Sequence, residues 1–401
     1  MIDASRVLAG PYLAMLLGDL GAEVIKIERP GEGDQTRAWG PPWVGEGEHR
    51  TSAYFVSANR NKRSVALDLS TAAGRAAFER LLAGADVLVE NFLPAQWRGL
   101  GFRGARFTRR HPRLVQCTVT SYGADGPEAD RPAYDLVLQA ESGLMSLTGF
   151  EGGEPVRVGV AIVDIAAALY GLAATLAALR QRDVGGGGSG GGGEGGRGRG
   201  SHVEVSLVDA GAALLSYAAQ SWLADGRQPG RFGSGHPNLA PYRAFRAADG
   251  WFVVGVGSQD IWRRFCAAIG RDALAGDPRF AKARDRVAHR AELEELLAEI
   301  FAARSVAHWD AAMRAHRVPA APPASIGEAL AKARDRGQLL DLPAGLYGPL
   351  STIAAPFRFD GRRPAPAAPP PGVGEHTGEV LGGSSASIDG TRSGSARRSR
   401  P

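Results

Sequence analysis

Cysteine is scarce in this 401-residue sequence, which contains only Cys117 and Cys266. The two residues lie far apart in apolar surroundings, so they form no metal-binding pattern, and a disulfide framework is not expected. A reducing compartment is the natural interpretation. We also expect no segment long and apolar enough to span a membrane. The prediction is an intracellular protein without a membrane partner.

Common catalytic motifs are also missing from the positions where their chemistry would need them. We find no G-x-G-x-x-G after a strand, no G-x-x-x-x-G-K-[ST], no H-E-x-x-H and no G-x-S-x-G at a strand-to-helix turn. The histidines do not cluster, and no metal site is expected. A dinucleotide oxidoreductase, a P-loop enzyme, a zinc hydrolase and an α/β-hydrolase are therefore unsupported.

Charge of one sign is not in large excess, because 47 Lys and Arg residues face 42 Asp and Glu residues, a formal net charge of +5. Much of the arginine excess lies in the tail, Arg392 to Arg400, and in the segment Arg197 to Gly200. The chain has no long basic helix and no basic-aromatic module, so a nucleic-acid partner is not expected. A modest basic bias suits a polyphosphate ligand instead.

What the sequence does contain is an alternation of strand-like and helix-like segments. Strands are predicted at 23–28, 86–91, 114–118 and 202–207, and helices at 12–20, 71–83, 165–182 and 209–223. This alternation is typical of an α/β fold with a doubly wound parallel sheet. The first strand is cut short at Met1, so we expect an incomplete amino terminus from which any targeting segment is missing.

Composition also divides the chain into parts. Asp249 and Gly250 separate two apolar runs, which predicts a β-hairpin in a smaller α+β domain. A nearly pure glycine tract predicts a flexible insertion, and a Ser-, Gly- and Arg-rich end predicts disorder. The predicted organisation is a large α/β domain in 1–224 with the insertion at 185–200, a small domain in 225–325, a return to the large domain in 326–382 and a disordered tail in 383–401.

A single carboxylate, Asp164, interrupts the apolar run from Arg157 to Tyr170. The valines and isoleucine in 158–163 predict a short buried strand or extended segment, and the Ala- and Leu-rich residues 165–182 predict a helix. Asp164 would therefore lie where the helix begins. There it is either an N-cap or a reactive group whose ionised form the helix dipole favours and which can act as a nucleophile. The spacing alone leaves both interpretations open.

Six segments of the chain carry a resemblance when they are taken together. They are R-V-L-A-G-P (6–11), G-D-L-G-A-E-V-I-K-I-E-R-P-G-E-G-D (18–34), N-R-N-K-R-S (59–64), E-N-F (90–92), Y-D-L-V-L-Q-A-E-S-G-L-M-S-L-T-G (134–149) and G-V-A-I-V-D (159–164). In this order they resemble the class III CoA-transferases, which include the carnitine and formate CoA-transferases and are related to the methylacyl-CoA racemases. The resemblance runs from about Ser5 to His376. Residues 36–45 and 236–245 look most like the succinyl-CoA:glutarate CoA-transferases of this family.

The resemblance implies an acyl-CoA:carboxylate CoA-transferase that uses coenzyme A as a co-substrate and holds no permanent cofactor. Its expected partners are an acyl-CoA such as succinyl-CoA, a small carboxylic acid such as glutarate or a related dicarboxylate, and a second copy of the chain in an interlocked homodimer. A eukaryotic source would place it in the mitochondrial matrix, and any other source in the cytoplasm. Two alternatives stay open, a 2-methylacyl-CoA racemase on the same fold and a CoA-binding protein without turnover.

The resemblance also implies roles for individual residues. Asp164 matches the nucleophilic aspartate of the family. Residues implied to lie at the CoA site are Arg29, Leu67, Asn91 and Phe92. Residues implied to lie at the substrate site or on a loop that covers it are Trp39, Tyr134, Asp135, Gly255, Val256, Gly257 and Ser258. Where the racemases carry histidine before an aspartate, this chain has Tyr134, a poor base at neutral pH because its reference pKa is about 10.

Several of these residues also have a plainer interpretation. Arg29 could be a solvated loop charge, although a guanidinium that follows a strand end also suits the phosphates of CoA. Trp39 could pack a proline-rich loop, and Leu67 could be a core residue of its strand. Asn91 and Phe92 could simply end a strand.

A dicarboxylic substrate would need a further cation. Its second carboxylate requires a positively charged or hydrogen-bonding partner. The sequence offers Arg37, His236 and Arg243 as candidates for that role.

Overall fold

The computed structural model describes residues 1–102, 105–184, 198–365 and 368–382. The predictions made for residues 185–197 of the glycine tract and for the tail 383–401 lie outside the described residues. The remaining predictions can be compared with the structure.

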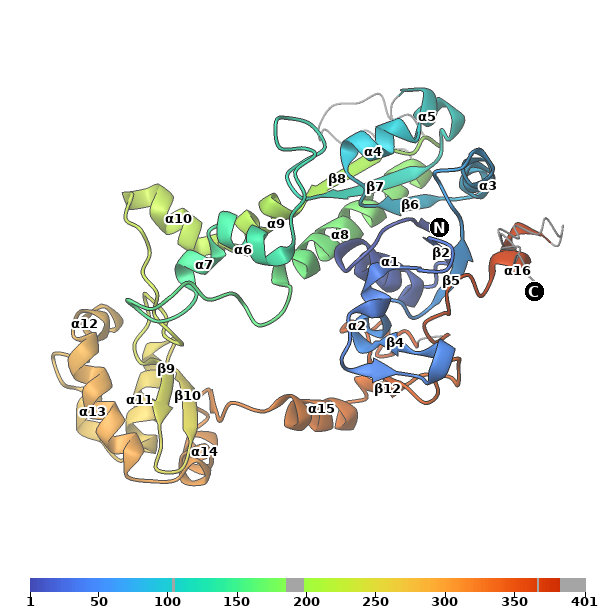
Figure 1. Ribbon diagram of the computed structural model, residues 1–401. Coiled ribbons are helices and arrows are strands. Elements are labelled where there is room, and N and C mark those ends of the chain that lie inside the picture. The colour runs from blue at the N-terminus through green and yellow to red at the C-terminus, as the bar shows by residue number, and fades with distance from the viewer. Residues whose placement is uncertain (103–104, 185–197, 366–367, 383–401) are drawn as a thin grey trace, which may run out of the picture.

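The architecture is built on a six-stranded parallel sheet in the order β5-β2-β1-β6-β7-β8 (Figure 1). Its strands are β1 (Ile2–Asp3), β2 (Val24–Glu28), β5 (Lys62–Ala66), β6 (Val87–Glu90), β7 (Val115–Thr120) and β8 (His202–Ser206). The chain runs outward from β1 to β5, returns to the middle at β6 and then runs outward to β8. The predicted doubly wound α/β fold is confirmed, and its direction switches between β1 and β6, where open sheets of this kind bind ligands.

Helices cover both faces of this sheet, as Figure 1 shows. Successive side chains of a strand point to opposite faces, so Val87 and Val89 join one core while Leu88 joins the other. The first core contains α1 (Ala9–Asp19), α8 (Ile162–Val184) and α9 (Leu207–Leu214), and the second contains α3 (Ala72–Ala83), α4 (Pro94–Gly99) and α5 (Ala105–Arg110). The ends of β1 and β6 therefore emerge between two packed layers.

Helix α8 corrects two predictions. Its length and composition would suffice to cross a membrane, contrary to our expectation for the chain, but its inner face packs in the first core through Val163, Ala167 and Leu172. Of the two alternatives predicted for 158–163, a short buried strand or an extended segment, the buried strand is also wrong. The helix already begins at Ile162, and Val160 is 54% exposed and belongs to no strand.

The helix predicted over 209–223 is in fact two helices, α9 and α10 (Ser216–Asp225). Ser216 adopts φ +46°, a left-handed conformation that breaks the regular helical ladder. Nothing in the apolar pattern of this segment signals that break.

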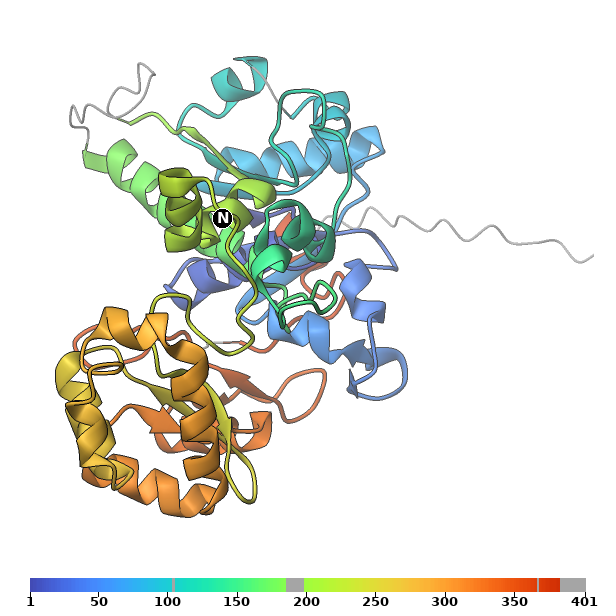
Figure 2. The same cartoon turned by 90° about the vertical axis from the view of Figure 1, so that its left-hand side faces the viewer.

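A separate hydrophobic core lies within residues 240–318. The predicted hairpin is confirmed, because β9 (Tyr242–Arg246) pairs antiparallel with β10 (Trp251–Gly255), and β11 (Ala320–Ala321) adds a third strand. The helices around it are α11 (Gln259–Ala268), α12 (Ala283–Ala288), α13 (Arg290–Ala302) and α14 (Val306–Ala315), which Figure 2 shows enclosing the hairpin. The exact domain boundaries stay a prediction.

The chain leaves this second body through α15 (Ile326–Asp335), as Figure 1 shows. It then forms the small sheet of β12 (Leu339–Asp341) and β13 (Ser351–Ile353), and the last described helix, α16 (Thr377–Leu381), lies beside β5. His376 donates its backbone N–H to the carbonyl of Ser64, at 2.9 Å. The carboxyl-terminal segment is thereby attached to the large sheet.

Candidate active site

A cavity of about 440 Å³ opens at the switch point of the sheet. It is lined by the turn after β1, the segment after β6, the end of β7 and the first turns of two helices, α6 (Asp135–Glu141) and α8. Of the residues predicted for the site, it brings together Asn91, Phe92, Tyr134 and Asp164. Asn91 and Phe92 follow β6 directly, whereas Tyr134 and Asp164 lie at the starts of α6 and α8. All four reach the cavity at the carboxyl edge of the parallel sheet.

Asp164 lies in the first turn of α8, as its half-buried third residue. Its carboxylate makes no hydrogen bond or ion pair with any other described residue. The N-cap interpretation is therefore wrong, because a capping side chain accepts a backbone N–H of its own helix. The carboxylate faces the cavity unpaired, which is the condition of a reactive group and not of a structural one.

The pKa of Asp164 is raised from 3.8 to about 7, first by the loss of hydration on burial and second by the negative charge of Asp135. We had expected the helix end to favour the ionised form. The dipole effect is present at that position, but burial and the neighbouring carboxylate outweigh it. The group thus changes charge near neutral pH.

Asp135 performs the capping of α8 from a different helix. Its Oδ1 accepts the backbone N–H of Val163 at 2.8 Å and that of Asp164 at 3.4 Å. Its Oδ2 accepts from Nε2 of Gln139 at 2.5 Å, and Oε1 of Gln139 accepts the backbone N–H of Val158 at 2.8 Å. Asp135 and Gln139, both buried, therefore fix the start of α8 and with it the backbone of Asp164.

The turn after β1 forms the wall of the cavity beside Asn91. The Asn91 side chain forms two hydrogen bonds with the backbone of Arg6. It accepts the N–H of Arg6 at 2.9 Å and donates to the carbonyl of Arg6 at 2.8 Å. The next residue, Val7, has φ +72°, a strained conformation for a β-branched residue. Its N–H donates to the Asp34 carboxylate, at 3.3 Å to the nearer oxygen. Strain of this kind persists where the surroundings over-determine it, most often at functional sites.

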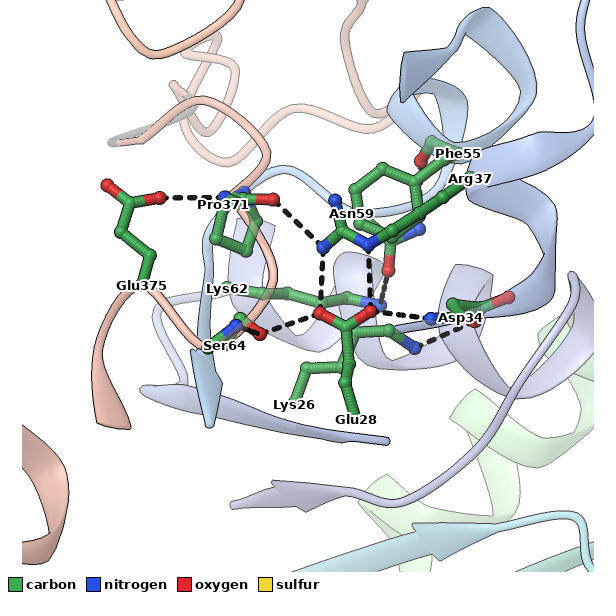
Figure 3. Close-up of polar contacts among 12 residues, drawn as sticks. Lys26, Glu28, Asp34, Arg37, Phe55, Asn59, Lys62, Ser64, Pro371 and Glu375 are labelled. Atoms are coloured by element: carbon green, nitrogen blue, oxygen red, sulfur yellow. Dashed lines mark hydrogen bonds and ion pairs between the residues drawn. The ribbon is translucent and has the colours of Figure 1, made fainter. Parts of the chain in front are cut away.

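A buried network of charged side chains supports this turn (Figure 3). The ammonium of Lys26 lies 3.0 Å from a carboxylate oxygen of Asp34 and donates to the carbonyl of Ser5, also at 3.0 Å. Arg37 forms a two-point pair with Glu28, with bonds of 2.9 and 2.7 Å, and reaches the carbonyl of Pro371 at 3.0 Å. A buried pair that loses one partner is strongly destabilised, so we assign these charges to holding the site's frame.

The other two residues predicted for the CoA site, Arg29 and Leu67, do not line this cavity. Arg29 is exposed, pairs with Glu32 at 3.1 Å and lines a smaller adjoining cavity of about 170 Å³. The two cavities share Arg6 and Gln35. Leu67 is buried in the core beneath α3, as its plainer interpretation expected.

The predicted substrate-site residues divide between the two bodies. Trp39 packs edge-to-face against Tyr134, with ring centroids 6.2 Å apart, and so belongs to the wall that carries Tyr134. Gly255, Gly257 and Ser258 lie in the second body, with Gly255 at the end of β10 and Ser258 as N-cap of α11, and Val256 between them is buried in its core. None of these four residues lines the cavity that holds Asp164.

The three candidates for a second-carboxylate partner also lie elsewhere. Arg37 is engaged with Glu28, and Arg243 forms an ion pair with Glu294. The ring of His236 stacks on Tyr217 at 5.4 Å. None of the three lines the cavity. Sequence reasoning missed Arg6, which does line it, although its position directly after the first strand was a usable signal.

No group of three or more His, Cys, Asp or Glu side chains in the described part of the chain is placed to hold a metal ion.

Comparison with known proteins places this geometry in context. The family model of CoA-transferase family III matches residues 1–377. A succinate–glutarate CoA-transferase of Agrobacterium fabrum is 36% identical over 392 residues, covering 95% of this chain and 93% of that protein. An acetyl-CoA:oxalate CoA-transferase of Acetobacter aceti is 37% identical over 330 residues, covering 82% and 80%. The crystal structure of a CAIB/BAIF family protein from Brucella suis superimposes with a TM-score of 0.81 at 35% identity, covering 94% of this chain and 96% of that one.

Proposed function

Because this chain belongs to CoA-transferase family III and is a CoA-transferase, we propose that it moves CoA from succinyl-CoA to glutarate or a related dicarboxylate, with Asp164 as the nucleophile. The observation that carries the proposal is the unpaired carboxylate of Asp164 in the switch-point cavity. The succinate–glutarate enzyme of Agrobacterium fabrum supports the choice of acids. The acetyl-CoA:oxalate enzyme of Acetobacter aceti, at similar identity, shows that relatives differ in the acids that they use.

The first half of the reaction loads CoA onto the enzyme. A carboxylate oxygen of Asp164 attacks the thioester carbonyl, the carbon–sulfur bond breaks, and a mixed anhydride and CoA thiolate form. The thiolate then attacks the aspartyl carbonyl. The anhydride bond breaks, succinate leaves, and CoA is held as a thioester on Asp164.

The second half repeats these steps with the acceptor. A carboxylate oxygen of the acceptor attacks the aspartyl thioester and releases the thiolate, which gives a second anhydride. The thiolate attacks the acceptor's carbonyl, and the Asp164 carboxylate is regenerated. Each step exchanges one activated acyl group for another, so the overall reaction needs no external energy source.

The raised pKa of Asp164 fits this chemistry. A carboxylate that has lost hydration is a stronger nucleophile than a solvated one, and an operating pKa near the working pH keeps a useful fraction of it ionised. With a pKa of about 7, about half of Asp164 is ionised at neutral pH. The hydrogen bonds that Asp135 and Gln139 form around the start of α8 would keep the Asp164 carboxylate in position through the four successive attacks.

An interlocked homodimer remains part of the proposal. Large apolar side chains are exposed on α8 (Leu169, Tyr170 and Leu176) and on α10 (Trp222 and Leu223). Contiguous exposed apolar surface is characteristic of protein interfaces. The loop of Gly255, Gly257 and Ser258 would then cover an aspartate within the assembly. A molar mass of one chain in multi-angle light scattering would overturn this part.

The test of the function is direct product analysis. The enzyme is incubated with succinyl-CoA and a panel of acids, and the CoA products are identified by mass. Glutaryl-CoA should form, and Asp164→Asn should abolish it. Hydroxylamine added with succinyl-CoA alone should modify Asp164 and no other residue. Better transfer to formate than to any diacid would refute the substrate assignment, while a trapped adduct elsewhere would refute the role of Asp164.

A second experiment, incubation with a 2-methylacyl-CoA in deuterated water, tests the two alternatives. A racemase would exchange the α-proton of a 2-methylacyl-CoA for deuterium without any acceptor acid, because its acid–base pair acts on that carbon. A protein that only binds CoA would give neither exchange nor transfer. Either result would replace the proposed function.

A further inference from the structure

The cavity wall contains one acidic and one basic side chain. Among the residues that line it, Asp164 is the acidic one and Arg6 the basic one. Arg6 is exposed, and no described carboxylate pairs with its guanidinium. The site therefore holds one cation that no carboxylate in the described part of the chain neutralises.

Neighbouring cations differ from Arg6 in this respect. Lys26 is neutralised by Asp34, Arg29 by Glu32 and Arg37 by Glu28. A guanidinium next to an open cavity without a carboxylate partner is the arrangement that a negatively charged ligand completes.

Arg6 is also held in place for such a role. Asn91 fixes its backbone through two hydrogen bonds of 2.9 and 2.8 Å. Its guanidinium carbon lies 5.3 Å from the centroid of the Phe92 ring, within the range of a cation–π contact. The side chain is thus anchored at its base and along one face, while its guanidinium donates no hydrogen bond to any residue that the structure describes.

The proposed function creates a need for this cation. When one carboxylate of a diacid reacts at Asp164, the second carboxylate enters the same cavity and loses water. Burying that charge without a partner is costly, and a planar guanidinium matches a carboxylate with two parallel hydrogen bonds.

We propose that Arg6 binds the non-reacting carboxylate of the dicarboxylic acid and so selects diacids over monoacids. The inference rests on the proposed function. It assigns the selectivity to Arg6 in place of the candidates read from the sequence, Arg37, His236 and Arg243.

The test compares glutarate with pentanoate, a monoacid of the same chain length, in wild type and Arg6→Met. The reaction alternates between two enzyme forms, so kcat/KM for the acceptor reports only the half-reaction that begins from the enzyme–CoA thioester. Arg6→Met should lower kcat/KM for glutarate by roughly 10- to 100-fold, the effect of losing charge-assisted hydrogen bonds, and change that for pentanoate by less than about threefold. Arg6→Lys should recover part of the loss.

Arg284→Met is the matched control, because it removes an exposed arginine from the second body, where its side chain is 80% exposed. Arg284→Met should leave kcat/KM for both glutarate and pentanoate unchanged. Circular dichroism and thermal unfolding of each variant would confirm an intact fold.

Three results would overturn the inference. An equal loss for both acids together with a raised KM for succinyl-CoA would assign Arg6 to the phosphates of CoA. Wild-type enzyme that prefers pentanoate would refute diacid selection but leave CoA transfer standing. Wild-type enzyme that transfers CoA to no acid would refute the proposed function and this inference with it.

Discussion

Replacing Asp164 with asparagine should make the protein inactive and, at alkaline pH, more stable. The carboxylate has a pKa of about 7 in the folded protein against its ordinary value of 3.8. The native state therefore binds this proton more tightly than the unfolded chain does. Stability from Asp164 is complete below about pH 4, falls as the pH rises and is lost once the pH passes about 7. Asparagine has the same shape and no charge to bury.

The expected size of the effect follows from the same two values. Between about pH 5.5 and about pH 8.5, the free energy of unfolding of the wild type should fall relative to Asp164→Asn by at most about 2 kcal/mol. The figure is an upper bound because the carboxylate is half-buried and water screens part of its charge. Any contribution of the substitution that does not depend on charge cancels when the two pH values are subtracted.

The assay is chemical unfolding of both proteins at the two pH values and constant ionic strength, beside an activity measurement. Asp260→Asn is the control, since it makes the same change in the exposed first turn of α11, and its effect should not follow this pH dependence. A stability difference between Asp164→Asn and wild type that stays constant with pH would refute the argument that burial opposes ionisation. Full activity of the variant would remove Asp164 from the mechanism.

Three further substitutions test other parts of the structure. Asp135→Asn removes a charge that raises the pKa of Asp164, so the acid limb of the pH profile of kcat/KM for the acyl-CoA should move to lower pH. The pKa that this limb reports should stay above 3.8, because loss of hydration is the larger cause of the shift. An acid limb that does not move would contradict the effect of Asp135 on Asp164. Asn91→Ala removes both hydrogen bonds to the Arg6 backbone. It should lower the free energy of unfolding by about 1–3 kcal/mol and raise KM for the acyl-CoA. Unchanged kinetics would mean that these two hydrogen bonds have no role in catalysis. Gly200→Ala would place a Cβ 2.0 Å from the carbonyl oxygen of Leu114 and should lower Tm by several degrees, on the order of a 1–3 kcal/mol loss for overpacking, while Gly84→Ala, which meets nothing within 4 Å, should be tolerated.

The sheet could be predicted from the sequence because its signals are local. Short runs such as Val87 to Val89 are apolar, as is typical of strands buried on both faces, and helical segments lie between them. The same local reasoning failed before α8. Val158 and Val160 resemble a buried strand in composition, yet Val160 is exposed and the helix begins at Ile162.

The start of α8 could not be predicted because its cap comes from a distant part of the chain. An N-cap search examines the residue just before a helix, and that search selected Asp164. The cap is Asp135, on α6, 29 residues earlier. Similarly, Arg6 and Arg37 look alike as isolated arginines in the sequence. Only the folded structure shows that Arg37 forms an ion pair with Glu28 and that Arg6 forms no ion pair with any described carboxylate.

Asp164, in the first turn of α8, and Asp135, which caps that helix from α6, show why the N-cap prediction and the expected ionised form of Asp164 failed together. A carboxylate that caps its own helix accepts N–H bonds, which stabilise its charge, lower its pKa and weaken it as a nucleophile. Asp135 takes those bonds from Val163 and Asp164, so that the oxygens of Asp164 accept no hydrogen bond from the described residues. Its negative charge also raises the pKa of Asp164. Capping from another helix thus fixes the backbone of the proposed nucleophile and leaves its carboxylate available for attack, two requirements that one side chain could not meet.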